Sequence, residues 1–256
     1  MVEVEQGGAS KEGKKMDSKL QAIQDAIVED YKEALKDRLI SIILYGSAVS
    51  GEYVSGISDI NLMIVTSDDS LEILDRVIPL VKRFRKKGVS TPLFVTPTYI
   101  EQSLDVFPLE YLSIRSNYKI LYGKDVLKEI HIEKEHLRLQ CERELKRRVL
   151  LLKEAYLEGE RKDRFLSAVI KASVEGLVSI FRAIIFLYDL DQPKTKRQTV
   201  EKACSLLEMD PALFRHLIEI KGLKKDKIKD IKAIYTDYLN ALRSLSKRID
   251  TLEVGI

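Results

Sequence analysis

Apolar residues follow two different periodicities in this chain, and the change falls at Gly123. Before Gly123, short runs rich in Ile, Leu and Val are typical of buried strands and alternate with segments of helical spacing. After it, apolar residues recur every three or four positions and no run has the pattern of a strand. This arrangement predicts an α+β fold, a mixed sheet with flanking helices followed by an all-α helical bundle. The expected strands are 40–45, 60–66, 91–96 and 118–122, and the expected helices are 18–39, 69–87, 132–159, 163–189, 195–208, 211–221 and 225–250.

The same patterns predict three segments along the chain. Residues 1–18 are polar and contain glycine, so we expect a disordered leader, with Ser18 able to cap the first helix. Residues 19–124 form the expected α/β domain. Residues 125–256 form the expected helical bundle domain.

The composition argues against several classes of protein. A net charge of +3, from 43 basic and 40 acidic residues, is too balanced for an obligate partner of nucleic acid. The run 183–188 is the longest apolar run of the helical half and falls far short of the ~20 residues of a membrane span. The polar start is also unlike a signal peptide, so we expect a cytoplasmic protein with no membrane partner. Cys141 and Cys204 are expected to be reduced core thiols, and the low Asn and Gln content beside abundant Lys and Glu is typical of thermophiles.

Residues 44–65, LYGSAVSGEYVSGISDINLMIV, contain the most specific signal for a functional site. Gly46 follows an apolar run, where a glycine lets the backbone turn sharply and approach a ligand. If Ala48 begins a helix, its free N–H groups and dipole would offer a phosphate site beside Ser47. A plain strand-to-helix turn capped by Ser47 explains the same residues.

Asp59 makes a binding site the better interpretation. Eleven residues separate Ser47 from Asp59, which opens the second apolar run. Strand alternation is expected to place residues 59 and 61 on one face. Two acids there would chelate Mg²⁺ together with phosphate oxygens of a substrate. Position 61 is Asn61, whose carbonyl oxygen can ligate a metal but brings no charge.

The run of an apolar residue, Gly46, Ser47, eleven residues, Asp59, an apolar residue and position 61 resembles the signature of the DNA polymerase β-like nucleotidyltransferase superfamily. The expected element order, and a helical bundle after it, look like minimal and aminoglycoside nucleotidyltransferases. The resemblance implies that Gly46 and Ser47, with Ser58, hold a nucleoside triphosphate. It also implies Mg²⁺ at Asp59 and at position 61.

Two departures from the family's pattern concern catalysis. The family has an acid at position 61, and its third acid lies on the next strand, here STPLFVTP, which contains none. A missing unit charge ~4 Å from a cation is on the order of 4 kcal/mol per unit of cation charge at an effective dielectric near 20. Asp105 and Glu110 follow that strand and are the candidate substitute metal ligands. Helix capping by Asp105 and an ordinary helix-surface position for Glu110 are the simpler explanations of these two residues.

A polar stripe in the helical half offers further candidate contacts to a nucleotide. Lys171, Glu175 and Arg182 recur at helical spacing in an otherwise apolar segment. If the stripe faces a cleft between the domains, Lys171 and Arg182 would meet a nucleotide or an acceptor. A solvated face with an i,i+4 ion pair is the alternative.

Three functions fit these observations. The first is an enzyme in which Asp59 and Asn61 serve catalysis, moving a nucleoside monophosphate from Mg-NTP to the hydroxyl of an unknown acceptor. The second is a catalytically inactive, regulatory nucleotide-binding module, which the neutral Asn61 favours. The third is an interaction protein, such as a homo-oligomer, whose helical bundle is the working part. A third carboxylate near Asp59 would favour the enzyme.

Overall fold

The computed structural model describes residues 11–50, 58–160, 162–174, 176–193, 195–221 and 230–253. The chain forms two compact units: unit 1 comprises Met1–Gln102 and Asn117–Ile130, and unit 2 comprises Ser103–Ser116 and His131–Ile256. The segment 103–116 therefore packs with the helices of unit 2, although it precedes the expected boundary at residues 124/125. That boundary, as a division between independent domains, stays a prediction.

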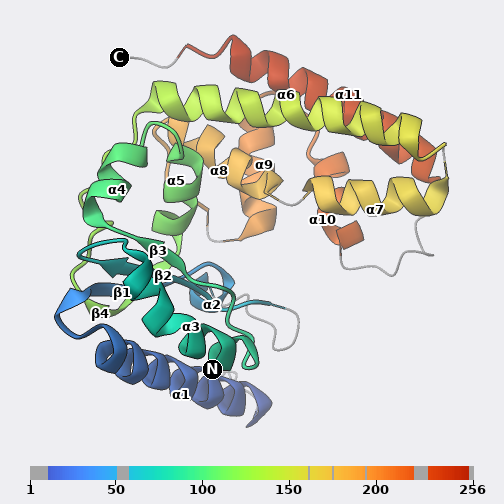
Figure 1. The fold of residues 1–256 in the computed structure, drawn as a ribbon. Helices are drawn as coiled ribbons and strands as arrows, with labels where there is room; N and C mark the ends of the chain where they lie inside the picture. Colours follow the sequence, from blue (N-terminus) through green and yellow to red (C-terminus); the bar gives the residue numbers. More distant parts are fainter. Residues whose placement is uncertain are drawn as a thin grey trace, which may run out of the picture. The chain divides into compact units, whose positions relative to one another are not determined.

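Unit 1 contains a mixed four-stranded sheet in the order β3-β2-β1-β4 (Figure 1). β1 is antiparallel to β2 and to β4, whereas β3 is parallel to β2. The two central strands, LISIILY and NLMIVT, are almost continuously apolar because both of their faces are buried. All four expected strands are present, as β1 (Leu39–Tyr45), β2 (Asn61–Thr66), β3 (Leu93–Val95) and β4 (Tyr118–Gly123).

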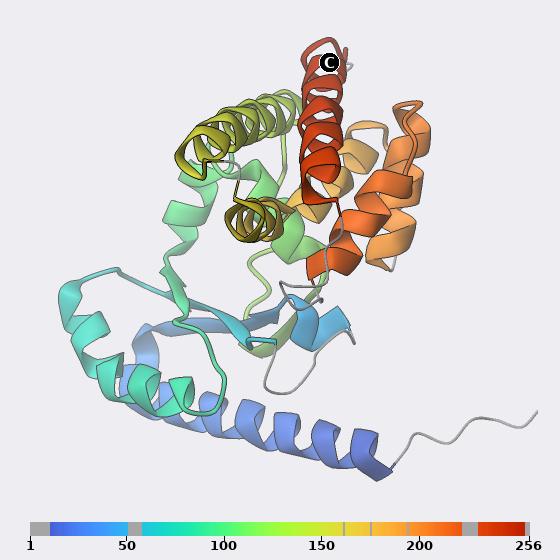
Figure 2. The same cartoon turned by 90° about the vertical axis from the view of Figure 1, so that its right-hand side faces the viewer.

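Helices α1 (Lys11–Leu35) and α3 (Leu71–Arg85) lie side by side on one face of this sheet (Figures 1 and 2). The Tyr31 ring of α1 stacks on Phe84 of α3 with 6.3 Å between the ring centroids. Among the described residues the Tyr31 hydroxyl has no hydrogen-bond partner, and burial raises the pKa of this side chain to about 12. The core between helices and sheet contains Ile23, Ile27, Tyr31, Leu35, Leu39, Ile42, Leu44, Ile60, Leu62, Ile64, Ile73, Val77, Phe84 and Val89.

The first helix begins earlier than the sequence predicts. Residues 11–18, which we expected in a disordered leader, are helical, and residues 1–10 lie outside the described residues. Lys, Glu and Met in this stretch favour a helix, so the helix continues through Ser18 instead of being capped there. A short 3-10 helix, η1 (Lys36–Arg38), then leads into β1.

Unit 2 is a bundle of helices in which α6 and α11 run along each other (Figure 1). No strand occurs among the described residues that follow Gly123, as predicted. Cys141 and Cys204 are free and buried in this bundle, and burial raises their pKa values to about 12 and about 11. In the part of the chain described, no helix is both long and apolar enough to cross a membrane. The helices are α5 (Pro108–Ser116), α6 (Lys134–Glu158), α7 (Asp163–Val174), α8 (Leu177–Leu187), α9 (Lys196–Leu206), α10 (Ala212–Lys221) and α11 (Ile231–Asp250).

The helix expected over residues 163–189 is broken into α7 and α8. The break lies at Gly176, whose φ of +77° is a conformation that L-residues rarely adopt. Arg148 of α6 lies in the break: its Nε donates to the Ser173 carbonyl at 3.4 Å. Its Nη2 is 2.9 Å from the position that a Cβ of residue 176 would occupy, so only glycine fits there without a shift.

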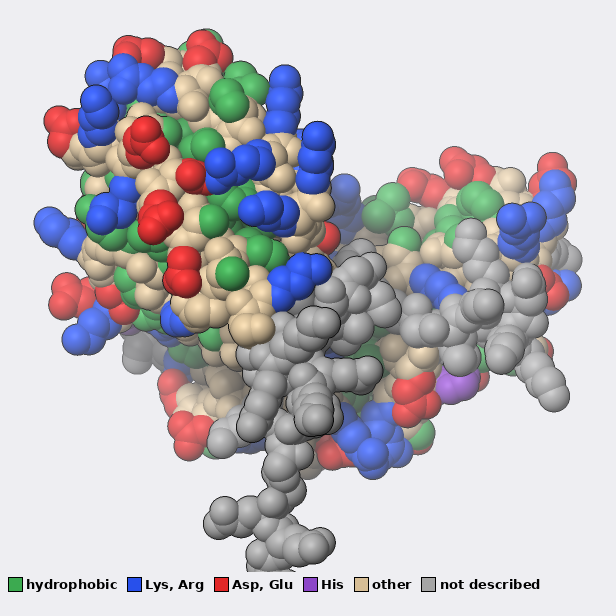
Figure 3. Space-filling view, turned by 90° about the horizontal axis from the view of Figure 1, so that it is seen from below, with side chains coloured by type: hydrophobic (Ala, Val, Ile, Leu, Met, Phe, Trp, Pro, Cys, Tyr) green, Lys and Arg blue, Asp and Glu red, His purple; other side chains and the backbone are tan. Residues whose placement is uncertain are grey.

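Charged side chains do not gather into a single-sign surface on the face shown in Figure 3, where acidic and basic groups are interspersed. The basic run at the end of α3 is engaged within unit 1. Arg83 and Lys87 lie over the Phe84 ring, at 4.6 and 5.5 Å from its centroid. Arg85 donates to the Thr91 hydroxyl at 3.1 Å. These contacts give the basic run partners within unit 1.

Candidate functional site

The turn after β1 is set by Gly46. Its φ of +80° suits glycine, and its N–H donates to the Asn117 carbonyl at 3.0 Å. The Gly46 carbonyl accepts from the N–H groups of Val49 and Ser50, at 3.0 and 3.2 Å. The helix that follows, α2 (Ser47–Ser50), is a single turn, so its dipole is small and the expected anion site at a helix N-terminus is weaker than the sequence predicts.

Asn61, the first residue of β2, lies directly against this turn. A Cβ on residue 46 would be 3.3 Å from Asn61 Nδ2, so glycine lets the two segments approach closely. On the other side of the amide, the Ser90 hydroxyl donates to Asn61 Oδ1 at 2.9 Å. The same hydroxyl is 3.3 Å from the Ile60 carbonyl, and the shorter contact assigns its proton to Asn61. Asn61 and Ser90 are both half-buried.

A bulge beside β2 decides which residue faces Asn61. Ile60 pairs with Val89 and Met63 pairs with Leu93, so Asn61 and Leu62 lie opposite the three residues 90–92. Such an extra residue bends a strand and redirects its side chains. As a result Ser90 meets Asn61, and Leu93 pairs beside Met63. The strand where the third acid was expected therefore presents a hydroxyl and an aliphatic side chain to this part of β2.

Asp59 is the carboxylate of the motif and is exposed. It precedes the first residue of β2 by two positions, so the regular strand that would align residues 59 and 61 begins only at Asn61. Within the described residues, no group of three His, Cys, Asp or Glu side chains could hold a metal ion. The described part of the site thus combines one carboxylate with an amide and hydroxyl groups.

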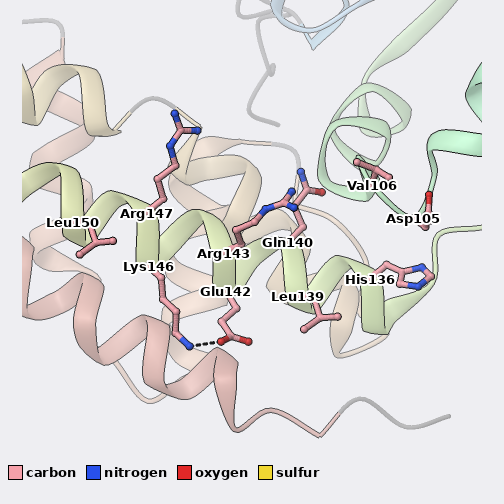
Figure 4. A pocket seen from close by; sticks show the side chains of 10 residues that line it. All are labelled: Asp105, Val106, His136, Leu139, Gln140, Glu142, Arg143, Lys146, Arg147 and Leu150. Atoms are coloured by element: carbon pink, nitrogen blue, oxygen red, sulfur yellow. Dashed lines mark hydrogen bonds and ion pairs between the residues drawn. The ribbon is translucent and has the colours of Figure 1, made fainter.

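Asp105 belongs to unit 2 and is exposed. It lies in the turn between α4 (Pro97–Ser103) and α5, and α5 begins at Pro108. The N-cap position of α5 is therefore Phe107, and the capping that we expected of Asp105 is wrong. Asp105 instead lines a cavity of about 690 Å³ together with α6 residues that include His136, Gln140 and Arg143 (Figure 4).

Glu110, in the first turn of α5, has a specific partner on α6. Its Oε2 accepts from Gln140 Nε2 at 2.7 Å, and Gln140 Oε1 accepts from the Leu109 N–H at 2.8 Å. The buried amide of Gln140 thus joins the two helices, and it occupies one carboxylate oxygen of Glu110. Glu110 is more than an ordinary surface acid of a helix. Its metal role, like that of Asp105, stays a prediction.

The polar stripe of the helical half does not form one helix face. Lys171 lies on α7 and Arg182 on α8, on either side of the break at Gly176, and both are half-buried. Glu175 lies outside the described residues. The single stripe inferred from a continuous helix is therefore wrong, because Lys171 and Arg182 lie on two helices. The i,i+4 pair of Lys171 with Glu175 stays a prediction.

Ser90 is the site residue that the sequence interpretation missed. The segment STPLFVTP contains no acid, and its first hydroxyl, that of Ser90, is the group that contacts Asn61. The residue type was a signal, since a serine hydroxyl can donate to a neighbouring amide oxygen. The bulge that brings this serine to Asn61 has no comparable signal in the sequence.

A four-stranded mixed sheet with helices on one face, a glycine turn between its central strands and a helical bundle after it define the nucleotidyltransferase-like α+β fold. Thirteen chains of known structure match this protein. One is spectinomycin adenyltransferase AAD(9) from Enterococcus faecialis, solved with ATP and spectinomycin, with a TM-score of 0.52 and 13% sequence identity. The match covers 87% of this chain and 99% of that chain, and at this identity it shows the fold. No known family profile matches the chain, and no curated protein matches its sequence.

Proposed function

We propose that the chain binds a nucleoside triphosphate at the edge of the unit 1 sheet formed by Gly46, Asp59 and Asn61. The observation that carries this proposal is the close approach of Gly46 to Asn61 Nδ2. This approach places a backbone turn that can contact a ligand beside a polar side chain at the start of a buried strand. The matching fold of an adenyltransferase solved with ATP supports the same class of ligand. In this proposal Ser47 and Ser58 offer hydroxyl groups to the phosphates.

Mg²⁺ fits this site only as a single ion that arrives with the nucleotide. One carboxylate, Asp59, combined with phosphate oxygens is a ligand set that Mg²⁺ uses in proteins. When bound, the ion would neutralise part of the phosphate charge. A two-ion site does not fit the described residues of unit 1, because position 61 is an amide and the neighbouring strand carries Ser90 and Leu93.

Binding without turnover, in a regulatory role, is the function that this site supports best. Transfer of a nucleoside monophosphate to a hydroxyl acceptor is the second candidate. It needs further carboxylates, and the exposed side chains of Asp105 and Glu110 are the proposed sources. Lys171 and Arg182 are the proposed nucleotide contacts from the bundle. In both cases we propose a cytoplasmic protein.

A thermal-shift screen of ATP, GTP, CTP and UTP, with and without Mg²⁺, tests the proposal. A nucleotide at a hundred times its dissociation constant should add ~2.7 kcal/mol to the free energy of unfolding. Asp59→Asn is the control that should lose the Mg²⁺-dependent part of the shift. No shift with any nucleotide would refute binding at this site. Release of pyrophosphate in the presence of hydroxyl acceptors would favour the transferase over the regulatory module.

A further inference from the structure

The amide of Asn61 is oriented by its two neighbours. The Ser90 hydroxyl donates to Oδ1 at 2.9 Å, so this oxygen is occupied on the side of β3. The Nδ2 group lies on the side of the Gly46 turn, at 3.3 Å from the position of a Cβ on residue 46. An amide nitrogen carries two donors and no acceptor. Position 61 therefore presents N–H groups, and not an oxygen, to the turn.

We infer that Asn61 holds a phosphate oxygen of the nucleotide through its Nδ2–H, that it does not ligate a metal, and that Ser90 is the positioning residue for this contact. The inference rests on the proposed function, since it assumes that a nucleotide binds at the Gly46 turn. An acid at position 61 would bind an ion and repel a phosphate. The amide reverses this preference, because it donates to the phosphate directly.

The two roles of Asn61 predict opposite effects of a divalent ion. A donor to phosphate contributes to affinity with or without Mg²⁺, because the contact needs no ion. A metal ligand contributes only when Mg²⁺ is present. Asn61→Ala therefore distinguishes the roles by the condition in which it weakens binding, and the discrimination requires no enzymatic activity.

The experiment is calorimetric titration of α,β-methylene-ATP into the full chain, once with EDTA and once with Mg²⁺. We expect the parent to bind in EDTA, and Asn61→Ala to weaken that binding about tenfold, as for the loss of one hydrogen bond to a charged group. Asn61→Asp should weaken it more than Asn61→Ala in EDTA, since a carboxylate repels the phosphate, and Mg²⁺ should restore most of that loss. Thermal melting of each variant checks that it folds.

Ser90 is tested in the same titration. Ser90→Ala should weaken binding about threefold in EDTA, because the Asn61 amide is then free to rotate. Ser90→Thr should keep the affinity of the parent, because threonine also carries a hydroxyl. Ser67→Ala, at an exposed serine just past the other end of β2, is the matched control and should change nothing.

Four outcomes would overturn the inference. If Asn61→Ala weakens binding only in Mg²⁺, residue 61 acts as a metal ligand and the proposed function still stands. If the parent binds only in Mg²⁺, the contact of Asn61 with phosphate does not support binding without the ion, so the inference fails while the proposed function stands. If Ser90→Ala binds like the parent, Ser90 does not position the amide. A parent that binds the probe under neither condition overturns the inference and the proposed function together.

Discussion

Replacing Asn61 by Asp is the sharpest perturbation of this site, because it adds one charge without changing the size of the side chain. At ~4 Å and an effective dielectric near 20, the attraction is ~4 kcal/mol per unit of cation charge, or ~8 kcal/mol for Mg²⁺. Three costs reduce this value. The new carboxylate must be partly desolvated at a half-buried position, it lies near Asp59, and the amide donor is lost. The Ser90 hydroxyl can continue to donate to residue 61.

We therefore expect Asn61→Asp to tighten Mg²⁺ binding by ~10- to 100-fold, which is ~1.4 to 2.8 kcal/mol. The assay is isothermal titration of Mg²⁺ into protein saturated with a nonhydrolysable nucleoside triphosphate. Asp59→Asn is the companion variant and should abolish Mg²⁺-dependent binding, since it removes the carboxylate of the motif. If Asn61→Asp changes nothing and the parent binds neither nucleotide nor Mg²⁺, the reasoning is refuted. Function would then lie in the helical bundle, as in an interaction protein or homo-oligomer.

Three further predictions concern other parts of the chain. The parent should lose up to ~2.7 kcal/mol of stability between pH 10 and 12, and Tyr31→Phe should make this loss smaller. Burial keeps Tyr31 neutral up to a pKa of about 12, whereas an unfolded tyrosine ionises near 10, so the folded state is disfavoured in this range. Equal losses in urea unfolding of parent and variant over this range would contradict the prediction. Gly176→Ala should lower the free energy of unfolding by ~1–3 kcal/mol, and by more than Gly88→Ala does. Both glycines have positive φ, but only a Cβ at residue 176 would contact Arg148, whereas no heavy atom of the described residues lies within 4 Å of a Cβ at residue 88. Equal losses of stability in the two variants would mean that the Arg148 side chain moves away from a Cβ at residue 176 without a penalty. Arg182→Ala should weaken nucleotide binding severalfold with little change in melting temperature, and unchanged affinity would remove Arg182 from the proposed site.

The division into a sheet and a helical bundle could be predicted because periodicity is a local property. β1 and β2 are short apolar runs, and apolar residues recur every three to four positions in the helices after Gly123, so each element follows from its own residues. The break at Gly176 could not be predicted in this way. Its cause includes Arg148 on another helix, and a single glycine in an apolar helical pattern is compatible with a continuous helix.

The candidate site was predicted only as far as its spacing allowed. The interval between Ser47 and Asp59 indicated two adjacent strands, and these place Asn61 against Gly46. The partner of Asn61 depends on the register between β2 and β3, which includes a bulge. A shift of one residue in register moves every side chain to the other face of the sheet. The sequence does not show this register, so it does not identify Ser90 as the partner of Asn61.

The buried length of β2 is separated from the polar residue at its start. Residues 62–66 are all buried and stabilise the sheet, whereas Asn61, at the start of the strand, is only half-buried. A substitution at position 61 therefore alters the chemistry of the site while the packing that maintains the fold stays the same. In evolutionary terms, such a sheet can exchange the residue at this position without a selective penalty on folding. Proteins of this architecture are then expected to diverge in reaction chemistry faster than in shape.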